Sequence, residues 1–393
     1  MITTDTAQHV AVINLAGADA EPAYPKISKD NRGWIKWGAD NLFPQRLLEM
    51  NSRSPVNSSV IEGKVTYVCG KGVRKSGEEG IAEYVGAPHT GGTWDEVIER
   101  VATDYVTFGG FALQIILNKA GTTVSVFHQD FSAIRIGEVD EYGKALTYRI
   151  SNDWSKIGGN NKPIELGAWP GSIDAASKGE AYIYYVTGYH PGLLHYTVPS
   201  YYRALGYVEA DGDLSVFYRN SIRNGFMPSV VISMPSNPPE EERERFQRAM
   251  EAKFTGPANA SRVLIVWGES GAVKPEIQPF TGAANVDAYN TIEGIVFQKI
   301  ISAHRLASPT LAGVSGSGNL SGNAAEMVDA FILFNYTVIE QLRRKILDHL
   351  NVFTKINRQG RLEIEELDVI DKIRESDGGG KAAEPLRTNI EKH

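Results

Sequence analysis

Two hydrophobic spacings follow one another in the first half of the chain. Apolar residues recur every three or four positions over 44–50, 55–69 and 94–105, and this spacing predicts helices. From residue 111 the apolar runs become short and turn sequences separate them. Strands are predicted over 111–117, 122–127, 134–136, 146–150 and 181–186. The pattern predicts an α+β fold with an antiparallel sheet, in which a turn-rich piece at 34–37 and a Gly-rich segment at 151–180 are irregular.

After Pro199 the spacing becomes that of longer helices, which are predicted over 200–224, 288–306 and 323–350. An insert between the first two is predicted to hold strands at 229–234 and 262–267 and a helix at 239–254. The loop 307–322, which precedes the third helix, is rich in Gly and Ser and contains no Lys, Arg, Asp or Glu.

The predicted helix 323–350 has the strongest helical pattern in the chain. Asn323 and Glu326 resemble a capping box at its start. One apolar stripe is predicted to contain Val328, Ile332, Ile339, Leu342, Ile346 and Leu350. Beyond residue 355, a turn at 357–360 is predicted between two short strand-like pieces.

Composition narrows the class of protein. The 393 residues include 40 Lys and Arg against 47 Asp and Glu, so the formal net charge is −7. An acidic balance argues against a protein that grips nucleic acid tightly through a basic face. Cys69 is the only cysteine, which fits a reducing compartment such as the cytoplasm. We expect a soluble chain without a signal peptide or membrane span, because no apolar run approaches the roughly 18–20 residues that a bilayer requires.

Motifs that would carry enzyme chemistry are missing from the sequence. It contains no phosphate-binding GxxxxGK[ST], no zinc-binding HExxH and no GxSxG nucleophile pattern. The Gly-rich run 316–322 has the wrong spacing for a dinucleotide site and follows a helix instead of a strand. His190 and His195 are interpreted as surface or packing residues, and Cys69 as a packed thiol. We therefore predict no enzyme activity, no cofactor and no metal.

Four local patterns, in this order, resemble the portal proteins of tailed bacteriophages and prophages. They are Tyr-Val-Thr-Phe-Gly-Gly-Phe-Ala at 105–112, the aromatic, Asn-Gly, Pro and apolar-strand run at 217–235, Thr-Gly-Pro-Ala-Asn-Ala at 255–260, and Ser-Pro-Thr-Leu-Ala-Gly at 308–313. Ser229 stands where Gly is frequent in the family, and Ser308 replaces an apolar residue before a motif that lacks its second Pro. No single pattern is specific, but their order and the helix lengths together carry the resemblance over residues 30–370.

The resemblance implies a portal-type subunit of α+β class that assembles as a ring oligomer. Its parts would be an N-terminal arm (1–23), a wing (24–199), two stem helices (200–225 and 285–306), a small α/β clip (226–284), a tunnel loop (307–322), a long tunnel helix (323–350), a return to the wing with a minimal crown (351–375) and a disordered tail (376–393).

The resemblance also implies a function and a set of partners. Portal proteins form a homo-oligomeric ring, a dodecamer, at one vertex of the virion capsid, and double-stranded DNA is packaged and ejected through it. The ring docks the terminase large subunit and the head–tail adaptor and contacts the major capsid or scaffold protein. The chain would then be made in the host cytoplasm and end in the virion, without contact with a membrane.

Three groups of site residues follow from this resemblance. In the tunnel loop Thr310, Ser315, Ser317, Asn319 and Ser321 would face DNA and make weak hydrogen bonds to phosphate oxygens. Alternatively, Gly and Ser serve only the flexibility of the loop. On the stem, the basic residues Arg219, Arg223 and Lys299 would face the channel or a neighbouring subunit, with ion pairs between subunits favoured. In the clip, adaptor or terminase contacts would be made by Glu240, Glu241, Arg243 and Arg245.

Two other classes of protein are alternatives. Another ring-forming connector or adaptor of the virion would be much shorter and would lack two helices that flank an insert. A DNA-processing enzyme would need acidic metal ligands or a phosphate loop, which the sequence does not offer.

Overall fold

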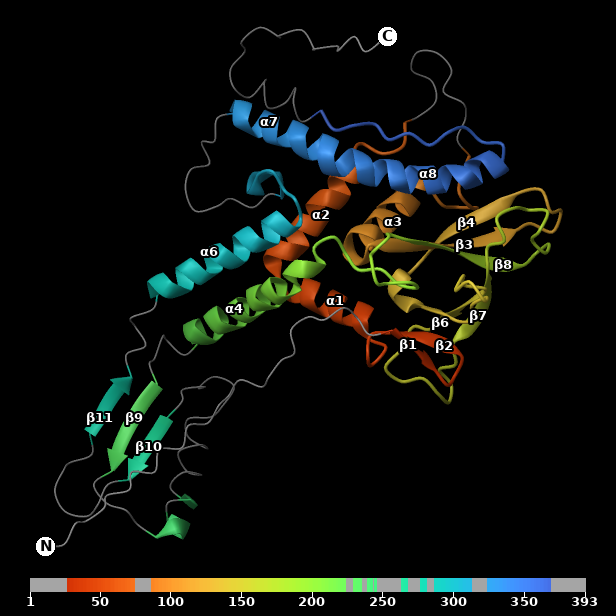
Figure 1. Cartoon of the computed structure of the whole chain (residues 1–393). Helices are drawn as coiled ribbons and strands as arrows, with labels where there is room; N and C mark the ends of the chain where they lie inside the picture. The colour runs from red at the N-terminus through yellow and green to blue at the C-terminus, as the bar shows by residue number, and fades with distance from the viewer. Residues whose placement is uncertain are drawn as a thin grey trace, which may run out of the picture.

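The computed structural model describes residues 27–74, 86–223, 229–234, 239–242, 244–245, 263–267, 276–280, 286–312 and 324–368. The expected N-terminal arm (1–23) and tail (376–393) lie outside the described residues. Figure 1 shows a mixed body of helices and strands, a helix pair that extends away from it, and a small sheet beyond the far end of that pair.

A six-stranded sheet with the order β4-β3-β8-β7-β6-β5 forms the centre of the body. Its strands are β3 (Gly110–Leu117), β4 (Val124–Gln129), β5 (Ile134–Ile136), β6 (Thr147–Ile150), β7 (Ile164–Ala168) and β8 (Ala181–Thr187). All neighbours are antiparallel except β7 and β8. A separate antiparallel hairpin joins β1 (Ile27–Asp30) to β2 (Trp34–Trp37). The α+β prediction is confirmed.

Three sequence predictions about the strands are wrong. The segment 151–180, expected to be irregular, contains β7, and the parallel β7–β8 pair means that the sheet is not purely antiparallel. The piece 34–37, expected to be turn-rich, is β2. The runs that form β2 and β7 are short and have little hydrophobic pattern of their own. The strand that pairs with each of them decides its conformation.

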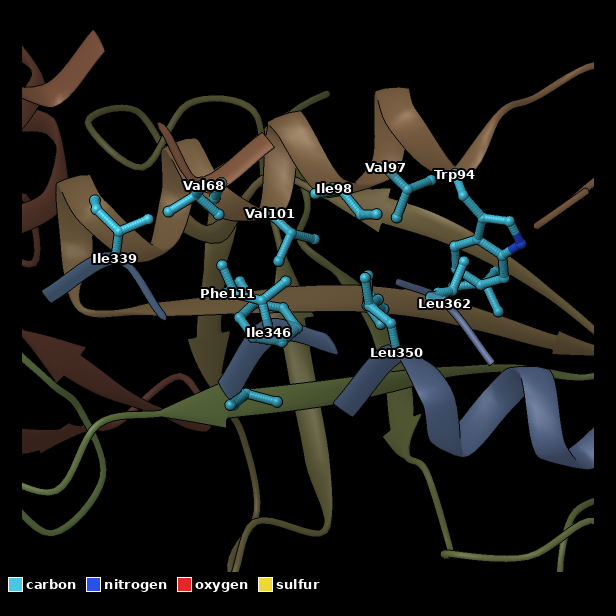
Figure 2. Close-up of a cluster of buried hydrophobic side chains, with 14 of the residues drawn as sticks. Val68, Trp94, Val97, Ile98, Val101, Phe111, Ile339, Ile346, Leu350 and Leu362 are labelled. Atoms are coloured by element: carbon cyan, nitrogen blue, oxygen red, sulfur yellow. The ribbon is translucent and has the colours of Figure 1, made fainter. Parts of the chain in front are cut away.

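Three helices pack with the sheet in two buried hydrophobic clusters. They are α1 (Phe43–Arg53), α2 (Pro55–Cys69) and α3 (Trp94–Phe108). The Thr93 side chain caps α3, and Gly109 ends it with a φ of 84°, at a point where a Cβ would lie 2.3 Å from the Val198 carbonyl oxygen. Figure 2 shows side chains of α3 and of the C-terminal helix gathered around Phe111 of β3. A helical face at 94–105 was predicted from spacing, and it is this buried face.

Two antiparallel helices form the extension from the body. A 3-10 turn, η2 (Tyr202–Ala204), leads into α4 (Leu205–Arg223), and α6 (Val286–Ala303) lies beside α4 (Figure 1). The helix predicted to begin at 200 therefore begins at 205, because Pro199 is followed by a tighter turn whose Tyr202 amide donates to the Pro199 carbonyl.

The small sheet contains β9 (Ser229–Met234), with β10 (Val263–Trp267) parallel and β11 (Glu276–Phe280) antiparallel to it. The strands predicted at 229–234 and 262–267 are confirmed, whereas β11 was not predicted. Most of the helix predicted at 239–254 lies outside the described residues.

One long helical run crosses the top of the body in Figure 1. It consists of α7 (Ala324–Phe334), a π-helical turn η5 (Asn335–Ile339) and α8 (Glu340–Ile356). The run was expected to end at 350, and the strand-like piece expected before 357 is helical instead. After a turn the chain lies against residues 71–74, where the Lys71 amide donates to the Glu365 carbonyl at 2.8 Å. Val73 and Ile364 form an isolated bridge there.

The π-helical turn changes which side chains of the long run are buried. Val328, Ile339, Ile346 and Leu350 are buried as predicted, but Ile332 is exposed, and Phe331 and Phe334 take its place in the core. An α-helical pattern assumes about 3.6 residues per turn. A π-helical turn contains more residues per turn. It therefore rotates the apolar stripe of α7 about the helix axis relative to the stripe of α8.

Candidate functional site

The candidate site is the helix pair α4–α6 together with its junction to the body. Along the half of the pair nearer the body, Leu205 and Val208 of α4 share a buried cluster with Val296 and Ile300 of α6. In the other half the Tyr218 hydroxyl donates to Glu293 Oε2 at 3.0 Å. The two helices therefore face each other along much of their length, and the Tyr218–Glu293 contact fixes their relative register.

Polar contacts attach α4 to the body. Asp211 is buried, and its carboxylate accepts from the Ser54 hydroxyl at 2.6 Å and the Val56 amide at 3.2 Å. Both donors lie at the start of α2, where a carboxylate also suits the positive end of the helix dipole. Gly212 lets α4 approach α1, since a Cβ there would lie 3.0 Å from the Arg53 Cβ. Gly212 is thus a point of close helix contact.

A buried polar cluster lies where α6 ends. His304 donates from Nε2 to Asn57 Oδ1 at 2.8 Å and stacks on the Tyr201 ring at a centroid distance of 4.6 Å. The Asn57 amide nitrogen donates to Asn51 Oδ1 at 2.6 Å, and the Tyr201 hydroxyl donates to the same oxygen. Burial keeps the pKa of His304 well below its ordinary value, with the positive charge of Lys64 adding to the effect. A neutral His304 therefore joins α6 to α2.

Lys64 is the unusual member of this region. It lies on α2 and is 3% exposed, and within the described part of the chain it has no hydrogen-bond partner or carboxylate. Burial, and secondly the charge of Arg305, lowers the pKa of Lys64 to about 7. Neither Lys64 nor Asp211 was predicted from the sequence. The signal was present, because Lys64 interrupts the apolar face of 55–69 between Val60 and Val68 at helical spacing.

Only the first part of the loop 307–322 is described. After α6, Arg305 has a left-handed backbone (φ 58°), and Leu306 and Leu311 are buried on either side of the exposed turn that carries Thr310. The hydroxyl groups of Ser308 and Thr310 lie 2.8 Å apart. The other four residues predicted to face DNA, Ser315, Ser317, Asn319 and Ser321, lie outside the described residues.

The predicted charged residues do not gather at one place. Arg219 and Lys299 are both exposed, on α4 and α6 respectively. Near the small sheet, Glu240, Glu241 and Arg245 are exposed as well. The side chain of Arg223 and all of Arg243 lie outside the described residues.

The described residues offer neither a metal-ligand cluster nor a membrane span. No three His, Cys, Asp or Glu side chains gather there as metal ligands would, and no helix there combines the length and apolar character that a membrane span needs. A shallow pocket of about 340 Å³ lies on the body, lined among others by His89, Thr123, Ser125, Asn357 and Gln359. It contains none of the predicted site residues.

A scan against models of protein families gives no match, and neither does a search of curated protein sequences. Solved structures do match. A chain in the neck of an empty gene transfer agent (GTA) particle, computed with C6 symmetry, has a TM-score of 0.53 and 13% identity over 85% of this chain and 87% of that chain. A chain in the neck of a native GTA particle, computed with C12 symmetry, has a TM-score of 0.51 and 14% identity over 85% and 88%.

A HK97 family phage portal protein from Corynebacterium diphtheriae has a TM-score of 0.41 and 14% identity over 72% of this chain and 84% of that chain. The two neck structures show a shared fold. The fold to which the sequence resemblance leads is therefore shared with chains of a GTA particle neck.

Proposed function

We propose that the chain is the subunit of a portal ring, a homo-oligomeric head–tail connector through which double-stranded DNA passes. The observation that carries the proposal is the helix pair α4–α6, which leaves the body at one point and has a small sheet beyond its far end (Figure 1). This arrangement lies within a fold that is shared, over 85% of the chain, with a protein in the neck of a GTA particle.

The parts of the fold take portal roles under this proposal. The body is the wing, α4 and α6 are the stem, and the region of β9–β11 is the clip. The loop 307–322 is the tunnel loop, α7 and α8 form the long helix, and the segment after α8 returns to the wing with at most a small crown. We infer a dodecamer in the capsid vertex of a virion, and one of the neck structures with this fold was computed with C12 symmetry.

The charge of the tunnel loop suits a conduit. Each lysine or arginine that contacts a phosphate adds affinity and salt dependence, because it releases counterions from DNA. The loop 307–322 contains neither, and its Ser, Thr and Asn side chains form only weak, uncharged contacts. DNA therefore slides past it. The formal charge of −7 on each subunit also fits a ring that contains DNA without holding it.

The proposed partners of the ring contact its clip and its wing. We propose that the exposed residues Glu240, Glu241 and Arg245, with Arg243, contact the terminase large subunit during packaging and the head–tail adaptor afterwards. The wing contacts the major capsid or scaffold protein.

Electron microscopy tests the proposed assembly. The purified full-length chain is expected to form rings with a central channel in negative stain, and class averages are expected to show twelve-fold symmetry. Mass photometry of the same sample measures the number of copies independently. A population that stays monomeric at all concentrations tested would contradict the portal function.

Shortening the tunnel loop is expected to separate assembly from DNA passage. Deleting 314–317 removes four residues from the loop and leaves the wing and stem untouched. We expect rings to form as in the wild type, while packaged DNA, measured as nuclease-protected DNA in complementation, falls at least about tenfold.

A full-length variant with Ser315→Ala and Ser317→Ala is the matched control. It keeps the length of the loop and removes two hydroxyl groups. If this control packages DNA nearly normally and the shortened loop does not, the length of the loop is needed for packaging and the two hydroxyl groups are not. Normal packaging by the shortened loop would refute its role.

A further inference from the structure

The side of α8 that faces away from the core carries a strip of basic side chains. Ile346, Leu350 and Phe353 of α8 are buried in the body. The exposed positions of α8 recur at helical spacing on the other side, and the basic ones continue into the segment that follows the helix. They are Arg344, Lys345, Lys355, Arg358 and Arg361, which we call the basic strip.

Carboxylates leave most of this positive charge unbalanced. Asp348 lies on the same side of α8 and reaches Arg361 Nη2 at 4.0 Å. The acids in the described segment after α8 are already paired with Arg343, Lys71 and Arg74, and they are Glu366, Glu365, Asp368 and Glu363. Among the residues that the structure describes, no carboxylate forms an ion pair with the other four cations of the basic strip. The strip is therefore a local excess of positive charge on a chain whose formal net charge is −7.

The helix dipole accounts for only part of the basic strip. Cations are stabilised near the C-terminal end of a helix, but this effect falls off within the last turn. Lys355 lies in the last turn of α8. Arg344 and Lys345 lie about three turns before the end of the helix, so the dipole does not explain them. Arg358 follows the helix with a left-handed backbone (φ 55°), a conformation that glycine adopts at lower cost.

The basic strip and the small sheet β9–β11 lie at opposite ends of the molecule (Figure 1). Under the proposed function this sheet belongs to the clip, where the terminase and later the adaptor dock from outside the capsid. The other end of the ring then faces the interior of the capsid, where packaged DNA is stored. Since α8 crosses that end of the body, the strip is on the side of the stored DNA.

We infer that the basic strip binds the phosphates of double-stranded DNA inside the capsid, separately from the tunnel loop. This inference rests on the proposed portal function. A duplex carries one negative charge per about 1.7 Å of its axis, so the roughly 16 Å between Arg344 and Lys355 along α8 match several phosphates. Such contacts hold the duplex without reading its sequence. A dodecamer presents twelve strips, so contacts that are weak singly add up.

Binding of closed circular DNA tests this inference. A closed circle has no end to thread into a channel, so its binding to assembled rings reports on the outer surface alone. Wild-type rings of the full-length chain are expected to retard a relaxed closed plasmid on a gel, with an affinity that falls steeply with salt. A variant with Arg344→Gln, Lys345→Gln and Lys355→Gln is expected to bind at least about tenfold more weakly at about 100 mM salt. Its slope of log affinity against log salt is expected to become shallower by at least about 2.

The matched control combines Lys29→Gln, Lys144→Gln and Lys162→Gln. These exposed lysines lie on β1 or beside β6 and β7, whereas α8 packs next to β4 at the opposite edge of the six-stranded sheet. The control therefore removes the same net charge from a different part of the body. It is expected to change DNA affinity less than about twofold. An equal loss in both variants would show that net charge, and not the strip, governs binding.

An acidic surface on a neighbouring copy is the competing occupant of the basic strip. If the strip joins subunits, the strip variant loses rings in mass photometry while the control keeps them, and the inference fails. It also fails if wild-type rings bind linear DNA but not the closed circle, because the contact then lies in the channel. Intact rings with unchanged DNA binding in the strip variant overturn the inference and leave the portal function standing. A wild type that forms no rings contradicts the portal function itself.

Discussion

Replacing Arg135 by methionine is expected to lower the free energy of unfolding by at least about 3 kcal/mol. Arg135 lies in β5 and is fully buried, and its guanidinium donates five hydrogen bonds. The acceptors are Asn41 Oδ1, the Asn41, Ser132 and Ile134 carbonyls, and Gln45 Oε1. Methionine fills much of the same volume but leaves these buried acceptors without a donor. Urea unfolding followed by tryptophan fluorescence measures the loss.

Arg149→Met is the matched control for Arg135→Met. Arg149 lies directly opposite Arg135 in the β5–β6 register, and it pairs with Glu165 at 2.7 Å nearer the surface. A partly exposed ion pair contributes about 1 kcal/mol or less. A similar loss in both variants would show that the hydrogen-bond set of Arg135 is not what stabilises the body.

Replacing Lys64 by methionine is expected to have the opposite effect and raise the free energy of unfolding at pH 7 by roughly 2–4 kcal/mol. Lys64 is buried like Arg135, with 3% of its surface exposed against 0%, but no carboxylate or hydrogen-bond acceptor among the described residues compensates its charge. The folded chain therefore gains when the ammonium group is removed. Lys71→Met is the control, because Lys71 is exposed and paired with Glu365 and Asp368, and it is expected to change stability much less.

The pH dependence of stability gives a second measurement on Lys64. The unfolded chain keeps the lysine proton up to about pH 10, whereas the folded chain releases it near its lowered pKa of about 7. Between these values the unfolded state binds more protons, so stability contributed by this group rises with pH. Lys64→Met is expected to remove that rise when urea unfolding is compared at pH 6, 8 and 9.5. An unchanged slope would mean that Lys64 is not buried without a partner.

A buried cation can either raise or lower the free energy of unfolding, as Arg135 and Lys64 illustrate. Arg135 is surrounded by carbonyl groups that its five N–H groups reach, so the desolvation of its charge is offset. Lys64 lies between apolar neighbours on α2 and next to the positive Arg305, so its desolvation is not offset. This difference lies in the surroundings of each residue and not in its type.

Several elements could be predicted because their signals are local. The helix at 94–105 has an apolar face at helical spacing, a Thr93 cap and the Gly109 stop, and the structure has α3 at Trp94–Phe108. The β3 and β4 strands flank a turn with Asn118 and Gly121, which hydrogen-bond across it. Such features depend on residues a few positions apart, so a sequence contains all the information needed to read them.

The candidate site was predictable only in outline. The two stem helices and the uncharged loop were predicted from the sequence, and Arg219, Arg223 and Lys299 were predicted to face the channel or a neighbouring subunit. Asp211 and His304, the buried polar groups that join the stem to the body, were not predicted, since their partners lie far away in the sequence.

The sequence by itself determined the α+β class, most helices of the body and stem, and the absence of charge from the loop 307–322. These properties follow from spacing and composition, which need no knowledge of distant residues. Tertiary structure alone decided the pairing of β7, the addition of β11, the π-helical turn that buries Phe334 in place of Ile332, and the opposite surroundings of Arg135 and Lys64. Each of these depends on partners brought together from elsewhere in the chain, and the free energy of those contacts exceeds the weak local preference.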